Sequence, residues 1–267
     1  MRVMEFEAAC RVVPGVPVPE SAPGARGVRW VGAGELADRS VLSSLLAAAR
    51  GASPAGSVIG DTVALAQGLA YTLVGPSAAG AYGAGLVVDL DPDGVWFGFG
   101  AQGFCERLAL RQVVVLPATD GFERRLAEPA VAILKPVFDQ VHQLTRVGQR
   151  VLWAAVSDSV HQIMLSAGLP RGTDSGPGLG AALDGAWLGA GAIVDALAER
   201  APELTARPRR FRVVDDDLAA SWLVRGGCCF VYREGADYCV TCPIIGDDER
   251  RAALLRWMRS IGLGTGR

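Results

Sequence analysis

Four of the six cysteines of this chain lie in one short stretch, residues 226–243, which reads GGCCFVYREGADYCVTCP. Cys228 and Cys229 are adjacent, and Cys239 and Cys242 form a C-x-x-C pair that is followed by Pro243. Four cysteine thiolates can hold one tetrahedral zinc ion, a [2Fe–2S] cluster or a [4Fe–4S] cluster. The spacing of the cysteines has to discriminate between these centres.

The adjacent pair fits a two-iron cluster better than a single ion. Structural zinc sites usually combine two C-x₂₋₄-C knuckles, and Cys228 and Cys229 have no spacer between them. Neighbouring residues on a regular strand point to opposite faces, so we expect Gly226 and Gly227 to let the backbone deviate. A two-iron cluster is wider than one ion and accommodates adjacent thiols more readily. The spacing therefore favours [2Fe–2S] and leaves zinc open.

The residues between the cysteines could serve as the wall of such a centre. Arg225 and Arg233 flank it, and their positive charge would stabilise a reduced cluster or attract an anionic partner, unless they are ordinary surface arginines. Four apolar or aromatic side chains could exclude water: Phe230, Val231, Tyr232 and Tyr238.

The elements around the cysteines predict an α+β fold that is mainly helical. We expect a C-terminal hairpin with strands at 228–233 and 238–243, and a second hairpin that joins 85–90 to 95–100 through the turn DPDG. Residues 111–118 predict another strand, and residues 1–30 read as strand and loop. Apolar spacing predicts helices at 36–51, 126–147, 149–168, 181–200 and 247–261.

Length and composition set the remaining expectations. With 267 residues and a net charge of −2, the chain can bury its own core, and nothing in it demands nucleic acid or an anionic membrane as a partner. The uncharged stretch 62–88 favours two buried helical pieces that meet at Gly75-Pro76 over a membrane span. Glu5 and Glu7 stand where a signal peptide needs an apolar run, so we expect a cytoplasmic protein whose clustered cysteines bind metal or do redox work. A soft domain boundary is expected near 205, between a helical domain (1–205) and an iron–sulfur segment (206–267).

Residues outside the cysteine segment offer little other chemistry. Cys10 and Cys105 are expected to be buried, and the two histidines, His142 and His161, are not spaced as a metal pair. Candidates for an aromatic groove that binds a substrate are Trp222, Tyr232 and Trp187, although each is more typical of a core.

The cysteine segment resembles the FhuF family of siderophore-iron reductases. The family pattern is C-C-x10-C-x2-C, and this chain has nine residues between Cys229 and Cys239. The flanking R-x-x-C-C-F-x-Y-R and C-x-x-C-P are also similar, with Gly227 in place of the usual serine. The resemblance is specific over about residues 220–245 and only general over 60–200, and the first 55 residues add nothing to it.

The resemblance implies a cytoplasmic ferric-siderophore reductase with a [2Fe–2S] cluster on Cys228, Cys229, Cys239 and Cys242. Siderophores hold Fe³⁺ with hard oxygen donors and hold Fe²⁺ far more weakly, so one electron releases the iron. The implied partners are a ferric siderophore, of hydroxamate type, and an external electron donor such as a ferredoxin or a flavin reductase. Two alternatives remain: a structural zinc or cysteine-cluster protein, and an iron–sulfur electron carrier or redox sensor that has no siderophore substrate.

Overall fold

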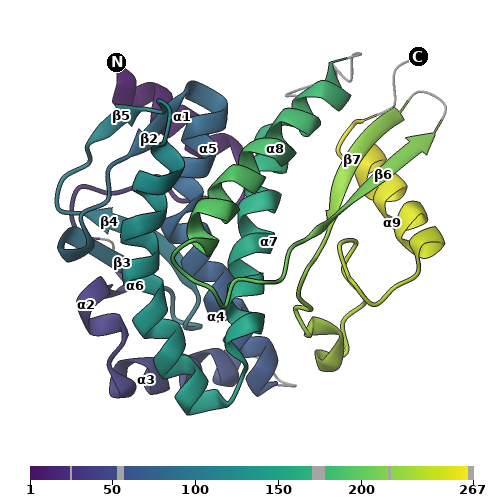
Figure 1. The fold of residues 1–267 in the computed structure, drawn as a ribbon. Helices are drawn as coiled ribbons and strands as arrows, with labels where there is room; N and C mark the ends of the chain where they lie inside the picture. Colours follow the sequence, from purple (N-terminus) through teal and green to yellow (C-terminus); the bar gives the residue numbers. More distant parts are fainter. Residues whose placement is uncertain (25, 53–56, 170–177, 216–217, 264–267) are drawn as a thin grey trace.

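A computed structural model describes residues 1–24, 26–52, 57–169, 178–215 and 218–263 (Figure 1). Helices dominate it, and short antiparallel sheets complete it. The α+β class and the mainly helical character expected from the sequence are confirmed.

Among the described residues, the helical body comprises helices α1 to α8. Their bounds are α1 Arg2–Val12, α2 Ala33–Leu36, α3 Arg39–Ala52, α4 Val58–Leu73, α5 Gly75–Ala84, α6 Phe122–Thr145, α7 Gln149–Ala167 and α8 Leu179–Ala198. Apolar residues at helical spacing account for these elements; in α3, for example, Leu42, Leu45, Leu46 and Ala49 form the buried face.

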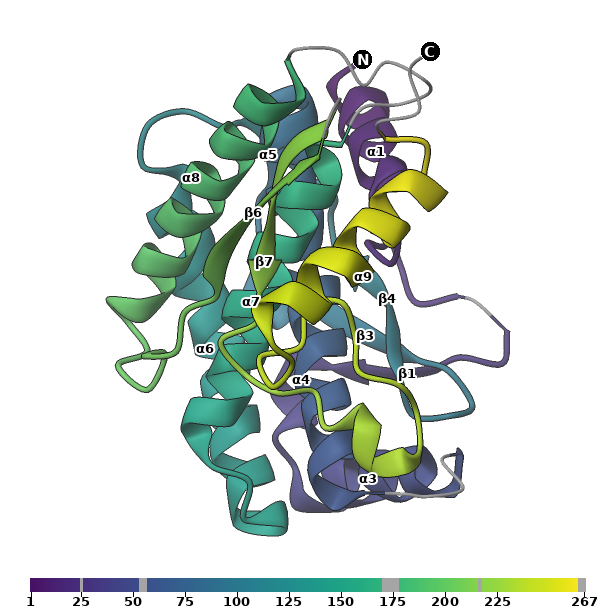
Figure 2. The same ribbon diagram turned by 90° about the vertical axis from the view of Figure 1, so that its right-hand side faces the viewer.

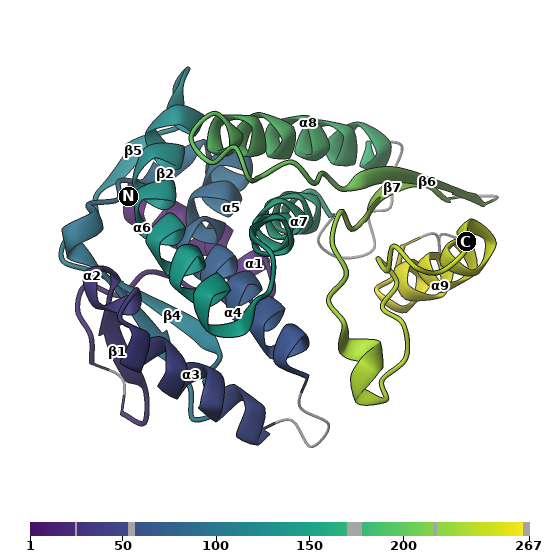
Figure 3. The same cartoon turned by 60° about the horizontal axis from the view of Figure 1, so that its bottom comes forward.

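Helix α7 is the central element of this body. Most of its side chains are buried, and it packs against α4, α5, α6 and α8 (Figure 3). A helix that is buried on all sides is expected to carry apolar side chains on every face. Its two buried ionisable residues, Asp158 and His161, therefore require hydrogen-bond partners nearby.

In the part of the chain that the structure describes, three small sheets flank the helices, all with antiparallel pairing between their strands. One has the order β1-β3-β4 (Arg29–Gly32, Val95–Phe99, Cys105–Leu110), and the second joins β2 (Leu86–Val88) to β5 (Val115–Pro117). The third joins β6 (Arg209–Asp215) to β7 (Leu218–Val224) and packs against α7 and α8. A single turn of 3₁₀ helix, η1 (Pro92–Gly94), precedes β3.

The C-terminal part lies on the side of α7 and α8 away from the first two sheets (Figures 1 and 3). After β7 the chain passes through the cysteine segment, which contains the 3₁₀ turn η2 (Val231–Glu234), and ends in α9 (Asp247–Ser260). Helix α9 packs on the β6–β7 pair, where the rings of Trp257 and Trp222 lie 4.6 Å apart. The boundary near residue 205 stays a prediction.

Several expected elements are wrong in detail. Residues 2–12 form a helix instead of strand and loop, because Phe6, Ala9 and Cys10 give α1 a buried side against α5. Strands β2 and β3 do not pair with each other. Strand β2 pairs with β5, and β3 pairs with β1 and β4. The two strands expected within 228–243 are not formed, and the segment contains η2 and loops instead.

Other expectations are confirmed. The uncharged stretch forms α4 and α5, which meet at Gly75-Pro76, and the proline stands in the first turn of α5, where its missing N–H costs little. The helix expected at 126–147 is confirmed as part of α6, which contains both Pro129 and Pro136.

By length and composition alone, one described helix, α8, could cross a membrane, and α4 with α5, bent by 44°, could form a second span. Both features pack within the body, since α4 and α5 contact α7, and α8 contacts α6 and α7.

Candidate iron–sulfur site

The cysteine segment, residues 225–243, leaves the body at the end of β7 and returns to it before α9 (Figure 2). Its two ends are tied together, since the Arg225 N–H donates to the carbonyl of Thr241 at 2.9 Å. The Cys242 N–H donates in turn to the carbonyl of Cys239 at 2.9 Å, which closes the C-x-x-C turn. Sequence positions 228–229 and 239–242 are thereby held on neighbouring arms.

Asp158 on α7 anchors the first arm. Its carboxylate accepts the Gly226 N–H at 2.7 Å and the Gly227 N–H at 3.1 Å, one on each oxygen. The side chain is only 1% exposed, so these two donors are what a buried carboxylate requires. This contact joins the core helix of the body directly to the residues before Cys228.

The two glycines are required for close approach. A Cβ on Gly226 would lie 2.7 Å from the backbone of Arg207, and one on Gly227 would lie 2.9 Å from the Cβ of Ala154. The positive φ in this arm occurs instead at Phe230, at 61°. The expectation that the glycines supply the backbone deviation is therefore corrected: they bring the chain against α7, and Phe230 adopts the left-handed conformation.

The thiols of the two arms approach each other. The Sγ atoms of Cys229 and Cys239 are 4.0 Å apart, close to the ~3.8 Å that separates two thiolates on one tetrahedral ion with bonds of about 2.3 Å. The Phe230 N–H donates to the Sγ of Cys228 at 3.3 Å, and the Sγ of Cys239 lies 3.5 Å from the Thr241 hydroxyl. These donors are of the kind that stabilise thiolate sulfur in iron–sulfur centres.

The four thiols differ in exposure. Cys242 is buried, whereas Cys228, Cys229 and Cys239 are half-buried. Within the described part of the chain, no three or more His, Cys, Asp or Glu side chains converge on one ion position. The Cys229–Cys239 spacing fits two thiolates on one tetrahedral metal centre, which can be a zinc ion or one iron of a two-iron cluster.

Proton affinities in the site follow from the same contacts. The hydrogen bond with Cys239 lowers the pKa of the Cys229 thiol to about 5, with burial opposing the shift and Arg225 adding to it, and the pKa of Cys239 is raised in return. Burial raises the pKa of Cys228. One thiol of the approaching pair is thus ready to act as a thiolate ligand.

Burial raises the pKa of Asp158 to about 6, while the N–H donors of Gly226 and Gly227 and the charge of Arg225 oppose the shift. Arg225 itself reaches across to α4: with the Gln67 amide oxygen turned toward it, its two terminal nitrogens donate at 2.7 and 2.8 Å. Arg225 therefore lies between the body and the cysteine segment, whereas Arg233 is exposed and its guanidinium lies 5.2 Å from the ring centroid of Phe230.

Arg250 on α9 anchors the second arm. It is 1% exposed, and it donates to the carbonyls of Cys242 and Ile245 at 2.7 and 2.8 Å and pairs with Asp247. A buried guanidinium satisfies the carbonyls that follow the last cysteine. No sequence pattern distinguishes this residue, whereas Asp158 could have been noticed as a lone acid within an apolar helical stretch.

The aromatic candidates separate into core and surface. Trp222 is buried and its ring lies near Trp257, and the half-buried Trp187 packs against His161 at 4.6 Å between ring centroids. Tyr232 is half-buried and pairs with the exposed Tyr238 at 5.2 Å. Of the three, only Tyr232 lies in the cysteine segment itself.

The remaining cysteines and histidines are structural. Cys10 and Cys105 are buried as expected, and burial raises the pKa of each to about 12. His142 and His161 lie on different helices, and the Nδ1 of each ring is bonded to a backbone carbonyl, of Val147 and of Ser157. This agrees with the expectation that they do not form a metal pair.

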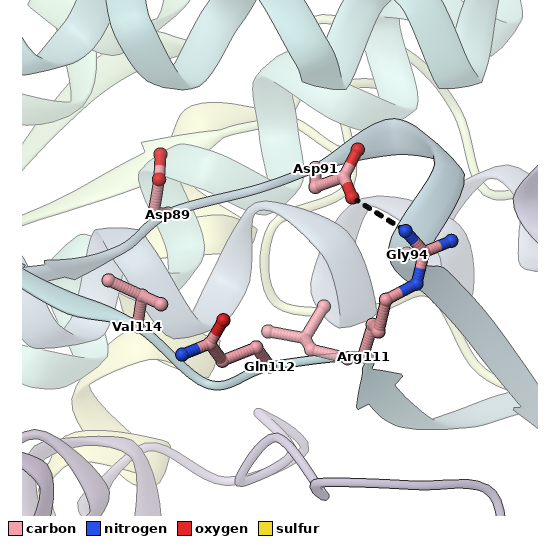
Figure 4. A pocket seen from close by; sticks show the side chains of 7 residues that line it. Asp89, Asp91, Gly94, Arg111, Gln112 and Val114 are labelled. Atoms are coloured by element: carbon pink, nitrogen blue, oxygen red, sulfur yellow. Dashed lines mark hydrogen bonds and ion pairs between the residues drawn. The ribbon is translucent and has the colours of Figure 1, made fainter.

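A separate cleft of about 300 Å³ lies by the turn between β2 and β3 (Figure 4). It is lined by Asp89, Asp91 and Arg111 among others, and the Arg111–Asp91 pair at 3.4 Å spans it. Both partners are largely exposed, and the cleft lies across the molecule from the cysteine segment (Figure 1). It contributes nothing to the thiol site.

Comparison with known proteins matches the same segment. Residues 225–243 fit the family model described as the FhuF 2Fe-2S C-terminal domain. No curated protein matches the chain. The match confirms the expectation of a [2Fe–2S] cluster, because the domain is defined by that group. The match covers the cysteine segment and not the helical body, so residues 225–243 of this chain are similar to the 2Fe–2S C-terminal domain of the FhuF family.

Proposed function

We propose that this chain is a cytoplasmic ferric-siderophore reductase and that Cys228, Cys229, Cys239 and Cys242 hold its [2Fe–2S] cluster. The observation that carries the proposal is the match of residues 225–243 to the FhuF 2Fe–2S domain. The approach of Cys229 and Cys239 to 4.0 Å and the N–H donor to Cys228 support the ligand set.

When bound, the cluster supplies a single electron at low potential. The residues of this chain hold the thiols in place, through Asp158 on the first arm and Arg250 on the second. Half-buried Cys228, Cys229 and Cys239 keep one side of the site near the surface, where a substrate or donor can approach. Arg225 places positive charge beside the thiols and favours added negative charge there.

The substrate is a siderophore complex of Fe³⁺, of hydroxamate type. One electron from the reduced protein converts Fe³⁺ to Fe²⁺, which the oxygen donors hold weakly, so that the iron leaves the siderophore. No general acid or nucleophile is required for this release. A separate one-electron donor, such as a ferredoxin or a flavin reductase, has to reduce the protein again before the next turnover.

The test is a single-turnover reaction. The anaerobically purified protein is reduced with dithionite, freed of excess reductant and mixed with a ferric trishydroxamate in the presence of a chelator that colours with Fe²⁺. We expect reoxidation of the protein and about one Fe²⁺ per cluster, as a one-electron centre requires. A protein that has the cluster spectrum but stays reduced would be an electron carrier or sensor without siderophore-reductase activity.

A further inference from the structure

A groove of about 550 Å³ lies between the return arm of the cysteine segment and α9. Asp237, Tyr238 and Val240 line one side of it, and Glu249, Ala253, Arg256 and Trp257 of α9 are among the residues that line the other. Figures 2 and 3 show how this arm passes from η2 back to the start of α9. Its volume is within the range of about 300–1,000 Å³ that small-molecule sites occupy.

The groove lies beside the thiols. Tyr238 and Val240 are the immediate neighbours of Cys239, whose Sγ is 4.0 Å from that of Cys229. A molecule that fills the groove therefore contacts the backbone arm that carries Cys239. Electron transfer to that molecule would need no movement of the helical body.

The lining suits a bulky organic complex. Tyr238 is 47% exposed, and Trp257 and Val240 are half-buried, so aromatic and aliphatic surface is available on both sides. Such surface gives contact area without fixing one chemical group.

The charges in the groove restrict the class of ligand. Asp237 and Glu249 contribute two negative charges and Arg256 one positive charge, and all three side chains are exposed. Three hydroxamates neutralise Fe³⁺, whereas three catecholates leave a complex with a strong negative charge. The lining favours a neutral or cationic complex and disfavours a strongly anionic one.

We propose that this groove is the binding site for the ferric siderophore, a neutral or cationic trishydroxamate complex. The inference rests on the proposed function and adds the substrate site to it. The bound Fe³⁺ gains one electron and becomes Fe²⁺, the reduced protein loses that electron, and an external one-electron donor restores it. No bond to the protein forms or breaks.

Two adjacent alanines of α9 give a matched test. Ala253 lines the groove and Ala252 does not and is exposed, so Ala253→Trp fills the groove while Ala252→Trp adds the same side chain outside it. The probe is the Ga³⁺ complex of desferrioxamine B, a cationic trishydroxamate that cannot be reduced, titrated into the holoprotein by calorimetry. We expect Ala253→Trp to weaken binding at least about tenfold, because the ring occupies ligand volume, and Ala252→Trp to leave it unchanged.

A second test of the groove changes its charge and needs no bulky substitution. The double variant Asp237→Asn, Glu249→Gln removes both carboxylates from exposed positions, and Asp248→Asn is its control on the first turn of α9. The double variant should weaken binding of the cationic probe about threefold or more, with a difference from wild type that shrinks at high salt.

The possible outcomes distinguish an error in the binding site from an error in the proposed reductase activity. Equal binding of the gallium probe by the wild type, Ala253→Trp and the double carboxylate variant would overturn the groove as the site, even if the wild type reduces ferric trishydroxamates. Absence of binding by the wild type would overturn it as well. Wild-type binding that Ala253→Trp abolishes, without reoxidation by the ferric complex, would support the site and contradict the proposed reductase.

Discussion

The cysteines of the helical body and those of the C-terminal segment show how burial decides the chemistry of one residue type. Cys10 and Cys105 lie among apolar side chains, where burial raises the pKa of both thiols to about 12. In the segment, Cys229 is half-buried, and hydrogen bonding from Cys239 lowers its pKa to about 5. The first two thiols are inert packing, whereas the Cys229 thiol of the segment is disposed to ionise and to ligate metal.

The two regions also differ in what holds them. The body is held by a continuous apolar core that extends from α1 to α8. The cysteine segment contributes few side chains to that core and is tied to its surroundings by buried polar residues, chiefly Asp158 and Arg250. Loss of one polar anchor should therefore affect the segment much more than loss of one surface contact.

The largest expected effect comes from the thiols themselves. Serine at any one of Cys228, Cys229, Cys239 or Cys242 should abolish the native visible spectrum of the cluster and the reductase activity, because a hydroxyl replaces a thiolate ligand. Cys105→Ser, a buried cysteine of the body, should keep both. Retention of spectrum and activity in two of the four segment variants would contradict the ligand set.

The next largest effect is expected from the removal of Arg250, which anchors the second arm of the cysteine segment. Arg250→Met leaves the carbonyls of Cys242 and Ile245 without their donor, and we expect a loss of about 3 kcal/mol in the free energy of unfolding. Arg251→Met, at the exposed neighbouring position, should change it by less than about 0.5 kcal/mol. Urea unfolding followed by tryptophan fluorescence measures both, and equal effects would show that burial of Arg250 has no special role.

The first anchor predicts a pH dependence. The pKa of Asp158 in the folded protein is about 6, above the usual 3.8 of an aspartate in the unfolded chain, so the folded state binds more protons between these values. The free energy of unfolding should therefore fall as pH rises from about 4 to about 6, by at most about 3 kcal/mol for this group.

Asp158→Asn is the comparison, because it cannot titrate. Its urea midpoint should lack this part of the pH dependence, so that the difference between wild type and variant changes across the window. A difference that stays constant from pH 4 to pH 7 would show that the carboxyl titrates normally.

A smaller loss is expected at Gly227. A side chain there meets the Cβ of Ala154 at 2.9 Å, so Gly227→Ser should destabilise the protein by about 1–3 kcal/mol. Adding Ala154→Gly should recover part of the loss by making room. Gly246→Ser, where an added Cβ meets nothing within 4 Å, is the control, and an equal effect at both positions in thermal unfolding would argue against the contact.

The sequence predicted the helices well and the strand pairing poorly. Strong apolar spacing located α3, α7 and α9, whereas β2 and β3 are short strands whose partners are decided by tertiary packing. Helix α1 was missed because its apolar positions have no clear period, and its burial against α5 stabilises it.

The sequence predicted which cysteines form the site, but it did not predict the residues that hold the cysteine segment in place. The four cysteines and the family are readable from spacing, and the match at residues 225–243 confirms the family resemblance there. Asp158 lies about seventy residues before the glycines that it binds, and no local pattern reports such a contact. Arg250 looks like any arginine of an amphipathic helix until the carbonyls around it are seen.

The central claim is that the segment holds a two-iron redox centre, and anaerobic purification with metal and sulfide analysis and EPR after dithionite reduction tests it most directly. We predict about two irons and two sulfides per chain, a reddish protein and a signal from one unpaired electron in the reduced state. One zinc per chain and no colour, even after reconstitution with iron and sulfide, would contradict the account and make the four cysteines a structural zinc site.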